Sequence, residues 1–204
     1  MTEQMSVKIA ALPSLRLTVE AHGLMAKKAL GQNFLLDQNI TDKIINLSLQ
    51  KQNKKDFSGA NVFEVGPGPG GLTRAVLAAE PKSLTVVEMD ERCIAIMNEI
   101  KEKTGDIIHI INGDAMQTDF SVLAPAPRHI ISNLPYNISV PLLVGWLKNI
   151  NAYDSLTLMF QKEVAERITA PIKTKDYGRI SVLSQLQCRI DHLLDLNPCC
   201  FTPA

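Results

Sequence analysis

Short apolar runs alternate with amphipathic stretches through the middle of the chain. The runs are four to six residues long and rich in β-branched side chains, as expected of buried strands. They cover residues 61–65, 84–88, 107–111, 129–132 and 155–160. The stretches between them carry apolar residues one helical turn apart, such as Ile96 and Ile100. Strands that alternate with helices predict an α/β fold whose mostly parallel sheet has helices on both faces.

Polar residues in front of the amphipathic stretches indicate where helices begin. Asp37, Asp90 and Ser139 are expected to be N-caps. The helix after Asp37 should bury three apolar residues at helical spacing, which are Ile40, Ile44 and Leu47. We therefore expect residues 1–59 to form a largely helical N-terminal extension and residues 60–204 to form the α/β core. Residues 171–179 are polar and turn-like, which predicts a loop.

Composition narrows the class of protein. A chain of 204 residues with 46% hydrophobic side chains is long enough to bury the core of one α/β domain. The 21 basic and 21 acidic residues give zero net charge, which excludes a broadly polybasic surface but allows a local basic patch. The four cysteines form no C-x-x-C pair, and no apolar run reaches the length of a membrane span. We expect a cytoplasmic protein with reduced thiols, no metal and no membrane contact.

A glycine-rich turn follows the first predicted strand, with the sequence Glu64-Val-Gly66-Pro-Gly68-Pro-Gly70-Gly71. Three interpretations are open: a dinucleotide site, an S-adenosyl-L-methionine (AdoMet) site, or a tight turn without a ligand. The prolines remove two N–H donors, which favours a ligand without phosphate. Glu88 ends the next strand, where a carboxylate can accept hydrogens from ribose hydroxyls. Asp114 follows the third strand and is either an acceptor for an adenine amine or an ordinary turn residue.

The segment Asn133-Leu-Pro135-Tyr136 follows the fourth predicted strand. At the carboxyl end of a parallel strand these residues should face a ligand crevice. An amide oxygen from Asn133 and a carbonyl from Pro135 or its neighbour can accept both hydrogens of an aromatic exocyclic amine and prepare it for methyl transfer. Tyr136 offers a ring on which a base can stack. The alternative is a proline turn with a surface tyrosine.

Seven motifs and the single residue Glu88, in this order, resemble those of the ribosomal RNA adenine dimethyltransferases, the KsgA family. They are residues 31–35, the glycine turn, Glu88, residues 113–115, residues 133–136, the stretches 160–167 and 177–182, and Phe201-Thr-Pro. The resemblance implies a Rossmann-like class I AdoMet-dependent methyltransferase followed by a small helical domain. The implied reaction is four methyl transfers onto two adjacent adenosines near the 3′ end of 16S rRNA, within the small ribosomal subunit.

The resemblance also assigns site residues. It places six residues at the cofactor, which are Asn33, Leu35, Gly66, Glu88, Asp114 and Asn133, and Gln32 belongs to the same motif. Asn133 and Pro135 would hold the target amine, while Tyr136 and Phe201 would sandwich the flipped base. Lys173, Lys175 and Arg179 are candidates for RNA contact, and we expect a monomer.

The chain departs from the family pattern at its end, since it stops at Ala204, before the last strand and the helical domain of the family. We therefore expect an incomplete sheet. Alternatives with the same fold are a 23S rRNA adenine methyltransferase and a non-catalytic ribosome-assembly or transcription factor. A nicotinamide dehydrogenase would rest on the glycine turn alone, because no Lys, Tyr or His is placed for hydride transfer.

Overall fold

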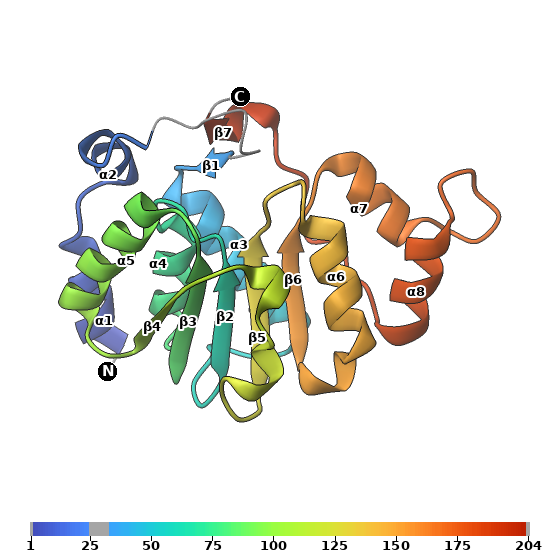
Figure 1. The fold of residues 1–204 in the computed structure, drawn as a ribbon, viewed down its shortest axis with the longest axis horizontal. Coiled ribbons are helices and arrows are strands. Elements are labelled where there is room, and N and C mark those ends of the chain that lie inside the picture. Colours follow the sequence, from blue (N-terminus) through green and yellow to red (C-terminus); the bar gives the residue numbers. More distant parts are fainter. Residues whose placement is uncertain (1, 25–32, 203–204) are drawn as a thin grey trace.

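A parallel sheet forms the centre of the molecule in the computed structural model, which describes residues 2–24 and 33–202 (Figure 1). In these residues five strands lie in the order β4-β3-β2-β5-β6. Their bounds are β2 (Asn61–Val65), β3 (Ser83–Glu88), β4 (Ile108–Asn112), β5 (Arg128–Asn133) and β6 (Ser155–Met159). All four pairings are parallel, so the α/β class predicted from the apolar runs is confirmed.

Helices cover both faces of this sheet. Neighbouring residues of one strand enter different cores, because side chains alternate across a sheet. Val62 packs in the core shared with α3 (Gln38–Lys51), α4 (Gly71–Ala78) and α5 (Glu91–Thr104). Phe63 packs on the other face, beneath α6 (Ser139–Lys148) and two short 3-10 helices, η2 (Ala115–Gln117) and η3 (Phe120–Val122). Trp146 of α6 is buried there.

The described part of residues 1–59 is largely helical. It contains α1 (Thr2–Ala10), α2 (Leu15–Ala21) and α3. Asp37 caps α3, accepting a hydrogen bond from the Asn39 N–H at 2.9 Å. The buried apolar residues of α3 are Ile44, Ile45 and Leu49, whereas the predicted Ile40 and Leu47 are only half-buried. The buried stripe is therefore shifted around the helix from the predicted one.

The predicted cap of α6 is wrong. Ile138 occupies the N-cap position, and Ser139 is the first helical residue. The Ser139 hydroxyl instead donates to the Tyr136 carbonyl at 3.1 Å, which closes the turn that follows β5. Asp90 caps α5 as expected, through the Arg92 N–H at 3.0 Å.

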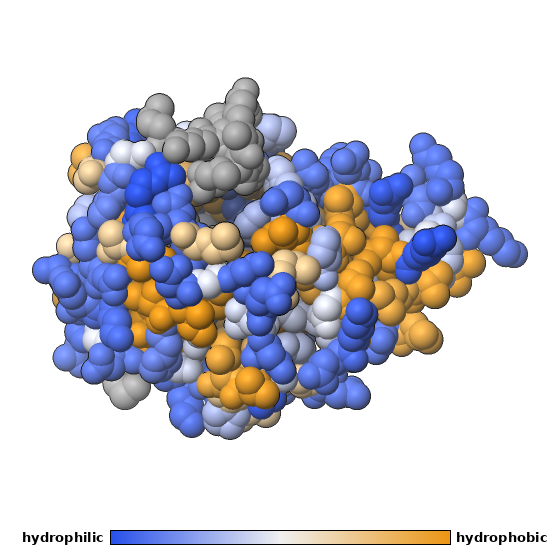
Figure 2. All heavy atoms as spheres, in the orientation of Figure 1, coloured by the Kyte–Doolittle hydropathy of each residue, from blue (hydrophilic) through white to orange (hydrophobic). Residues whose placement is uncertain are grey.

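Helices α7 (Lys162–Thr169) and α8 (Arg179–Gln187) follow β6 and enclose the predicted loop. They pack with α6 around a small third core. Part of the surface on this side of the molecule is apolar: Val182 and Leu186 of α8 are exposed, Leu186 to 81%. Figure 2 shows apolar side chains gathered over these helices.

A two-stranded antiparallel ribbon lies above the carboxyl ends of the sheet strands (Figure 1). It joins β1 (Phe34–Leu35) to β7 (Phe201–Thr202), with Leu35 opposite Phe201. The 3-10 helix η5 (Pro198–Cys200) leads into β7. Segments from opposite ends of the chain therefore meet above one edge of the sheet.

In the described residues no helix has both the length and the apolar character needed to cross a lipid bilayer.

Candidate functional site

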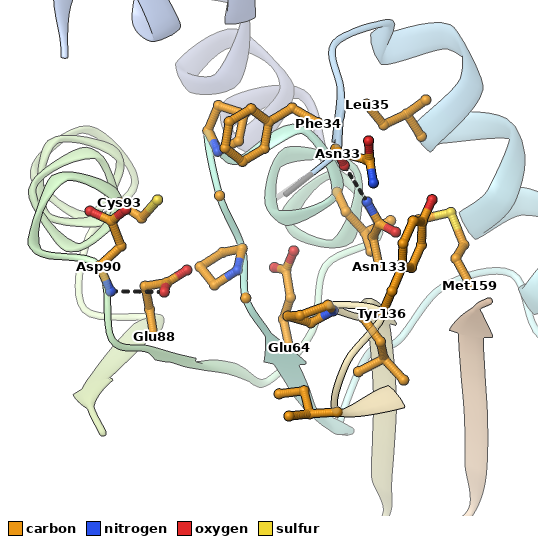
Figure 3. A pocket seen from close by; sticks show the side chains of 18 of the residues that line it. Asn33, Phe34, Leu35, Glu64, Glu88, Asp90, Cys93, Asn133, Tyr136 and Met159 are labelled. Carbon is orange, nitrogen blue, oxygen red and sulfur yellow. Dashed lines mark hydrogen bonds between the residues drawn. The ribbon is translucent and has the colours of Figure 1, made fainter. Parts of the chain in front are cut away.

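A pocket of about 590 Å³ opens at the carboxyl edge of the sheet, where Phe34 and Leu35 of β1 also line it (Figure 3). This volume is typical of sites for small organic ligands. Every strand of the sheet sends a residue into it at or just beyond its end, because parallel strands all finish at the same edge. In chain order these residues are Glu64 with Gly66, Glu88, Asp114, Asn133 and Met159.

The glycine turn forms one wall of the pocket. Gly66 and Gly68 have φ angles of 64° and 55°, in the left-handed region that favours glycine. A Cβ at Gly68 would lie 3.0 Å from the Phe34 ring, so a side chain there would displace Phe34. The turn therefore uses glycine both to reverse the chain and to let β1 approach the backbone closely.

Glu88 lies at the end of β3, with its carboxylate at the pocket. Its Oε1 accepts the backbone N–H groups of Met89 at 2.8 Å and Asp90 at 2.9 Å. Burial raises the pKa of Glu88, and these N–H groups oppose the rise by favouring the carboxylate. The backbone thereby fixes the orientation of an acceptor that suits hydroxyl hydrogens.

Asp114 lines the pocket just after β4, the strand next to that of Glu88. Its Oδ1 caps η2 by accepting the Met116 N–H at 2.8 Å. The sequence left open whether Asp114 is a turn residue or a ligand acceptor. The structure shows that it closes the turn and also lines the pocket.

Asn133 ends β5 and is held by the residue that precedes β1. Its Nδ2 donates to the Asn33 backbone carbonyl at 3.1 Å (Figure 3). Because Nδ2 donates to Asn33, the position of the amide oxygen is fixed as well, and Oδ1 is the atom of this side chain that can accept a hydrogen bond from a ligand. Asn33 thus sets the direction of the Asn133 amide through its main chain.

Pro135 and Tyr136 line the pocket next to Asn133. The Pro135 carbonyl accepts the Ile138 N–H at 3.2 Å, and a carbonyl oxygen has a second lone pair for another donor. The Tyr136 ring is half-buried and points into the pocket (Figure 3).

Phe201 does not line the pocket in the part of the chain that the structure describes. It is half-buried on β7, opposite Leu35, which does line the pocket. The structure therefore brings Asn33, Leu35, Gly66, Glu88, Asp114, Asn133, Pro135 and Tyr136 together at one pocket and leaves Phe201 one strand away. Gln32 lies outside the described residues.

Glu64 is a pocket residue whose protonation the sequence did not predict. Its side chain is 1% exposed, and the Thr73 hydroxyl donates to Oε2 at 2.7 Å. Burial raises the pKa of Glu64 to about 8, and the neighbouring charge of Glu88 adds to the rise. The carboxyl group is therefore mostly neutral at pH 7.

The charge of the lining restricts the ligand. Four carboxyl groups lie at the pocket, those of Glu64, Glu88, Asp90 and Asp114, while the described lining residues include no Lys, Arg or His. Glu64 is mostly neutral and Asp90 pairs with Arg92 at 2.6 Å, so the acidic character toward a ligand comes chiefly from Glu88 and Asp114. Such a lining suits a cationic ligand with hydroxyl and amine donors, and it disfavours a pyrophosphate. No three acidic, His or Cys side chains in the described ranges stand close enough to hold a metal ion.

Met159 is a pocket residue that the sequence analysis missed. It is the last residue of β6, so its position at a strand end was available as a signal. Its apolar side chain, however, looks like part of any buried strand. Asp90 was predicted only as a helix cap, and it also lines the pocket.

Comparison with known protein families gives a match over residues 23–204. The matching family is described as ribosomal RNA adenine dimethylase. A relative from Rhodospirillum rubrum, named ribosomal RNA small subunit methyltransferase A, is 45% identical over 94% of this chain and 65% of its own length. The chain thus spans slightly less than two thirds of this curated relative.

Two solved structures share the fold. A dimethyladenosine transferase from Plasmodium falciparum has a TM-score of 0.70 and 29% identity, over 82% of this chain and 57% of its own. The 23S rRNA methyltransferase ErmE has a TM-score of 0.54 and 27% identity, over 74% of this chain and 55% of its own.

Proposed function

Since this chain belongs to the ribosomal RNA adenine dimethylase family, we propose that it is an enzyme that methylates adenine N6 amines of 16S rRNA, with AdoMet as cofactor. The targets are two adjacent adenosines near the 3′ end, in the small ribosomal subunit, each converted to N6,N6-dimethyladenosine. The protein acts as a monomer in the cytoplasm, in ribosome biogenesis. The name of the Rhodospirillum rubrum relative supports the small subunit as the target.

The acidic pocket lining supports AdoMet as the cofactor. AdoMet carries a sulfonium and an ammonium group, and the carboxyl groups of Glu88 and Asp114 line a pocket that has no cationic residue among its described lining residues. Glu88 would accept the ribose hydroxyl hydrogens, and Asp114 the adenine amine. The other cofactor contacts would come from Asn33, Leu35, Gly66 and Asn133, all of which line the pocket.

The held amide of Asn133 is the observation that carries the proposal. Asn133 Oδ1 would accept one hydrogen of the target amine, because Nδ2 already donates to Asn33. The Pro135 carbonyl would accept the other hydrogen with its second lone pair. Two acceptors draw the nitrogen toward tetrahedral geometry and free its lone pair from the ring.

When bound, AdoMet supplies a methyl group on a positively charged sulfur. No strong base of the protein is required, because the proton on N6 becomes acidic once the methyl group arrives, and it passes to water. Tyr136 would stack on the flipped base and position its amine between the two acceptors. Phe201 would cover the opposite face of the base, which requires its side chain to turn toward the pocket from β7.

Basic residues around the loop between α7 and α8 are the proposed RNA contacts. Lys173, Lys175 and Arg179 lie in or at the end of this loop and are exposed. Each phosphate contact should contribute about 0.9 to the slope of log affinity against log salt concentration on a duplex. Replacing one of these residues by Ala should therefore lower that slope by about one.

A methyl-transfer assay tests the proposed function. Unmodified small ribosomal subunits would be incubated with labelled AdoMet and the protein, and the nucleosides identified by mass spectrometry. We expect N6,N6-dimethyladenosine from the wild type and none from Asn133→Ala. Calorimetric titration of AdoMet provides a separate readout of cofactor binding. No AdoMet binding, or binding without methylated adenosine, would refute the proposed reaction.

A 23S rRNA target is the second candidate, because the fold also matches ErmE. The higher TM-score of the dimethyladenosine transferase favours the first candidate. Mapping the methylated nucleotide in reactions with small and large subunits separates the two.

A non-catalytic assembly or transcription factor would need none of the methyl-transfer residues. The held amide of Asn133 and the oriented carboxylate of Glu88 argue for retained catalysis. If Glu88→Ala and Asn133→Ala variants kept full biological function, the non-catalytic role would be supported.

A further inference from the structure

Met159 lies beside the residue proposed to hold the target amine. In the pairing of β5 with β6, Met159 stands directly opposite Asn133. Partners in neighbouring strands lie about 4.8 Å apart and send their side chains to the same face. Both side chains line the pocket, and Met159 points toward Tyr136 (Figure 3). Met159 is therefore the apolar neighbour of Asn133 on the adjacent strand β6.

The groups proposed to hold the base at Asn133 are polar or aromatic. The amide itself and the Pro135 carbonyl are acceptors for N–H hydrogens, and Tyr136 offers a flat ring. The Met159 side chain is half-buried and packs against the core that contains Phe34 and Leu35. Next to the amine-binding position, Met159 thus supplies an apolar surface on a flexible, unbranched side chain.

Adding a second methyl group to the amine requires a place for the first one, which a single methylation does not. After the first transfer the N6 atom carries one methyl group and one hydrogen. The methyl group cannot make a hydrogen bond, so it must leave the polar acceptors before the nitrogen can react again. It needs an apolar space close to Asn133.

We propose that Met159 provides this space and is the specificity residue for the second methyl transfer; this inference rests on the proposed function. The thioether side chain moves aside and contacts the first methyl group while the remaining N–H donates to Asn133. In each transfer the amine nitrogen forms a bond to the methyl carbon as the bond from that carbon to the donor sulfur breaks. The sulfur keeps the electron pair as the thioether of S-adenosylhomocysteine, and one N6 proton passes to water.

A branched side chain at position 159 should block the second transfer. Met159→Ile places a rigid branch at Cβ, where methionine has none. In this variant the rate constant for the second transfer should fall about tenfold relative to the rate constant for the first transfer. The reason is that one methylene in an apolar pocket changes rates by roughly 10- to 200-fold. Met159→Ala leaves more room and should keep the ratio of the two rate constants within twofold of wild type.

Leu158 provides matched controls on the same strand. It faces the opposite side of the sheet and packs with the cores under α6. Leu158→Ile and Leu158→Ala disturb β6 to a similar degree without altering the pocket. Both should leave the ratio of the two rate constants unchanged.

The experiment is a single-turnover time course on unmodified small ribosomal subunits, with mono- and dimethyladenosine quantified by mass spectrometry. Accumulation of monomethyladenosine with Met159→Ile alone supports the proposal. An unchanged ratio in Met159→Ile, or an equal fall in Met159→Ala or in the Leu158 variants, overturns it. If Met159→Ile does not fold by circular dichroism, Met159→Leu replaces it with the same expectation. Absence of any methylated adenosine from the wild type would instead contradict the proposed function.

Discussion

The neutral carboxyl group of Glu64 predicts an unusual dependence of stability on pH. Glu64 lies at the end of the buried strand β2, with the Thr73 hydroxyl as its hydrogen-bond donor. Burial raises its pKa from 4.5 to about 8. In the unfolded chain the same group ionises near 4.5, so folding at neutral pH requires the uptake of a proton. The perturbation that tests this is Glu64→Gln, which keeps the shape and removes the ionisation.

The magnitude follows from the two pKa values. Because the folded-state pKa is the higher one, the contribution of Glu64 to stability is fully present below pH 4.5. It decreases between pH 4.5 and about 8. At pH 7 the solution lies about 2.5 units above the unfolded-state pKa of 4.5, and each unit corresponds to roughly 1.36 kcal/mol. The free energy of unfolding at pH 7 is therefore about 3 kcal/mol lower than it would be below pH 4.5. Glu64→Gln should not show this loss.

Urea unfolding at several pH values between 4.5 and 8 measures the effect. The free energy of unfolding of Glu64→Gln minus that of the wild type should increase by about 3 kcal/mol from pH 4.5 to pH 7. Other titrating groups cancel in this difference. Glu163→Gln, at an exposed position of α7, is the matched control, and its difference should stay flat. A flat difference for Glu64→Gln as well would show that Glu64 is ionised in the folded protein.

Three further predictions concern the sheet and the pocket. Burial lowers the pKa of His129 to about 4, so stability present above pH 6.5 should fall by about 3 kcal/mol as the pH drops from 6.5 to 4. His129→Asn should lose this dependence in urea titrations; a slope equal to that of wild type would contradict the assignment. Glu88→Gln should weaken AdoMet binding at least tenfold by calorimetry, roughly the loss of one hydrogen bond to a charged group, whereas Glu163→Gln should bind as wild type does. Gly68→Ala should reduce the free energy of unfolding by about 1–2 kcal/mol, because φ is 55° and the new Cβ would lie 3.0 Å from Phe34. Unchanged stability would show that the turn relaxes without cost.

The order and kind of the core elements could be predicted from the sequence alone. Five short apolar runs separated by amphipathic stretches indicated the five strands, and the capping residues Asp37 and Asp90 indicated two helix starts. These features depend on local periodicity and on hydrogen bonds within a few residues. One error had a local cause, because the Ser139 hydroxyl bonds to the carbonyl of Tyr136, three residues earlier, instead of capping α6. The other had a tertiary cause, because the buried stripe of α3 is set by the surface on which the helix packs.

Some features of the candidate site could likewise be predicted from the sequence, and others could not. The glycine turn, Glu88, Asp114 and Asn133 each follow a strand, so their meeting at one edge could be predicted from the parallel order. Their roles toward a ligand remain predictions.

Other features of the site required the tertiary structure, because they depend on residues that are far apart in the chain. The direction of the Asn133 amide is set by Asn33, 100 residues earlier. The pairing of Leu35 with Phe201 and of Asn133 with Met159 depends on which strands become neighbours. Local sequence carries no signal for such contacts, since burial and neighbouring charge arise only when the chain has folded. For the same reason, the sequence identified Glu64 as part of a motif, and only the folded chain decided that it keeps its proton.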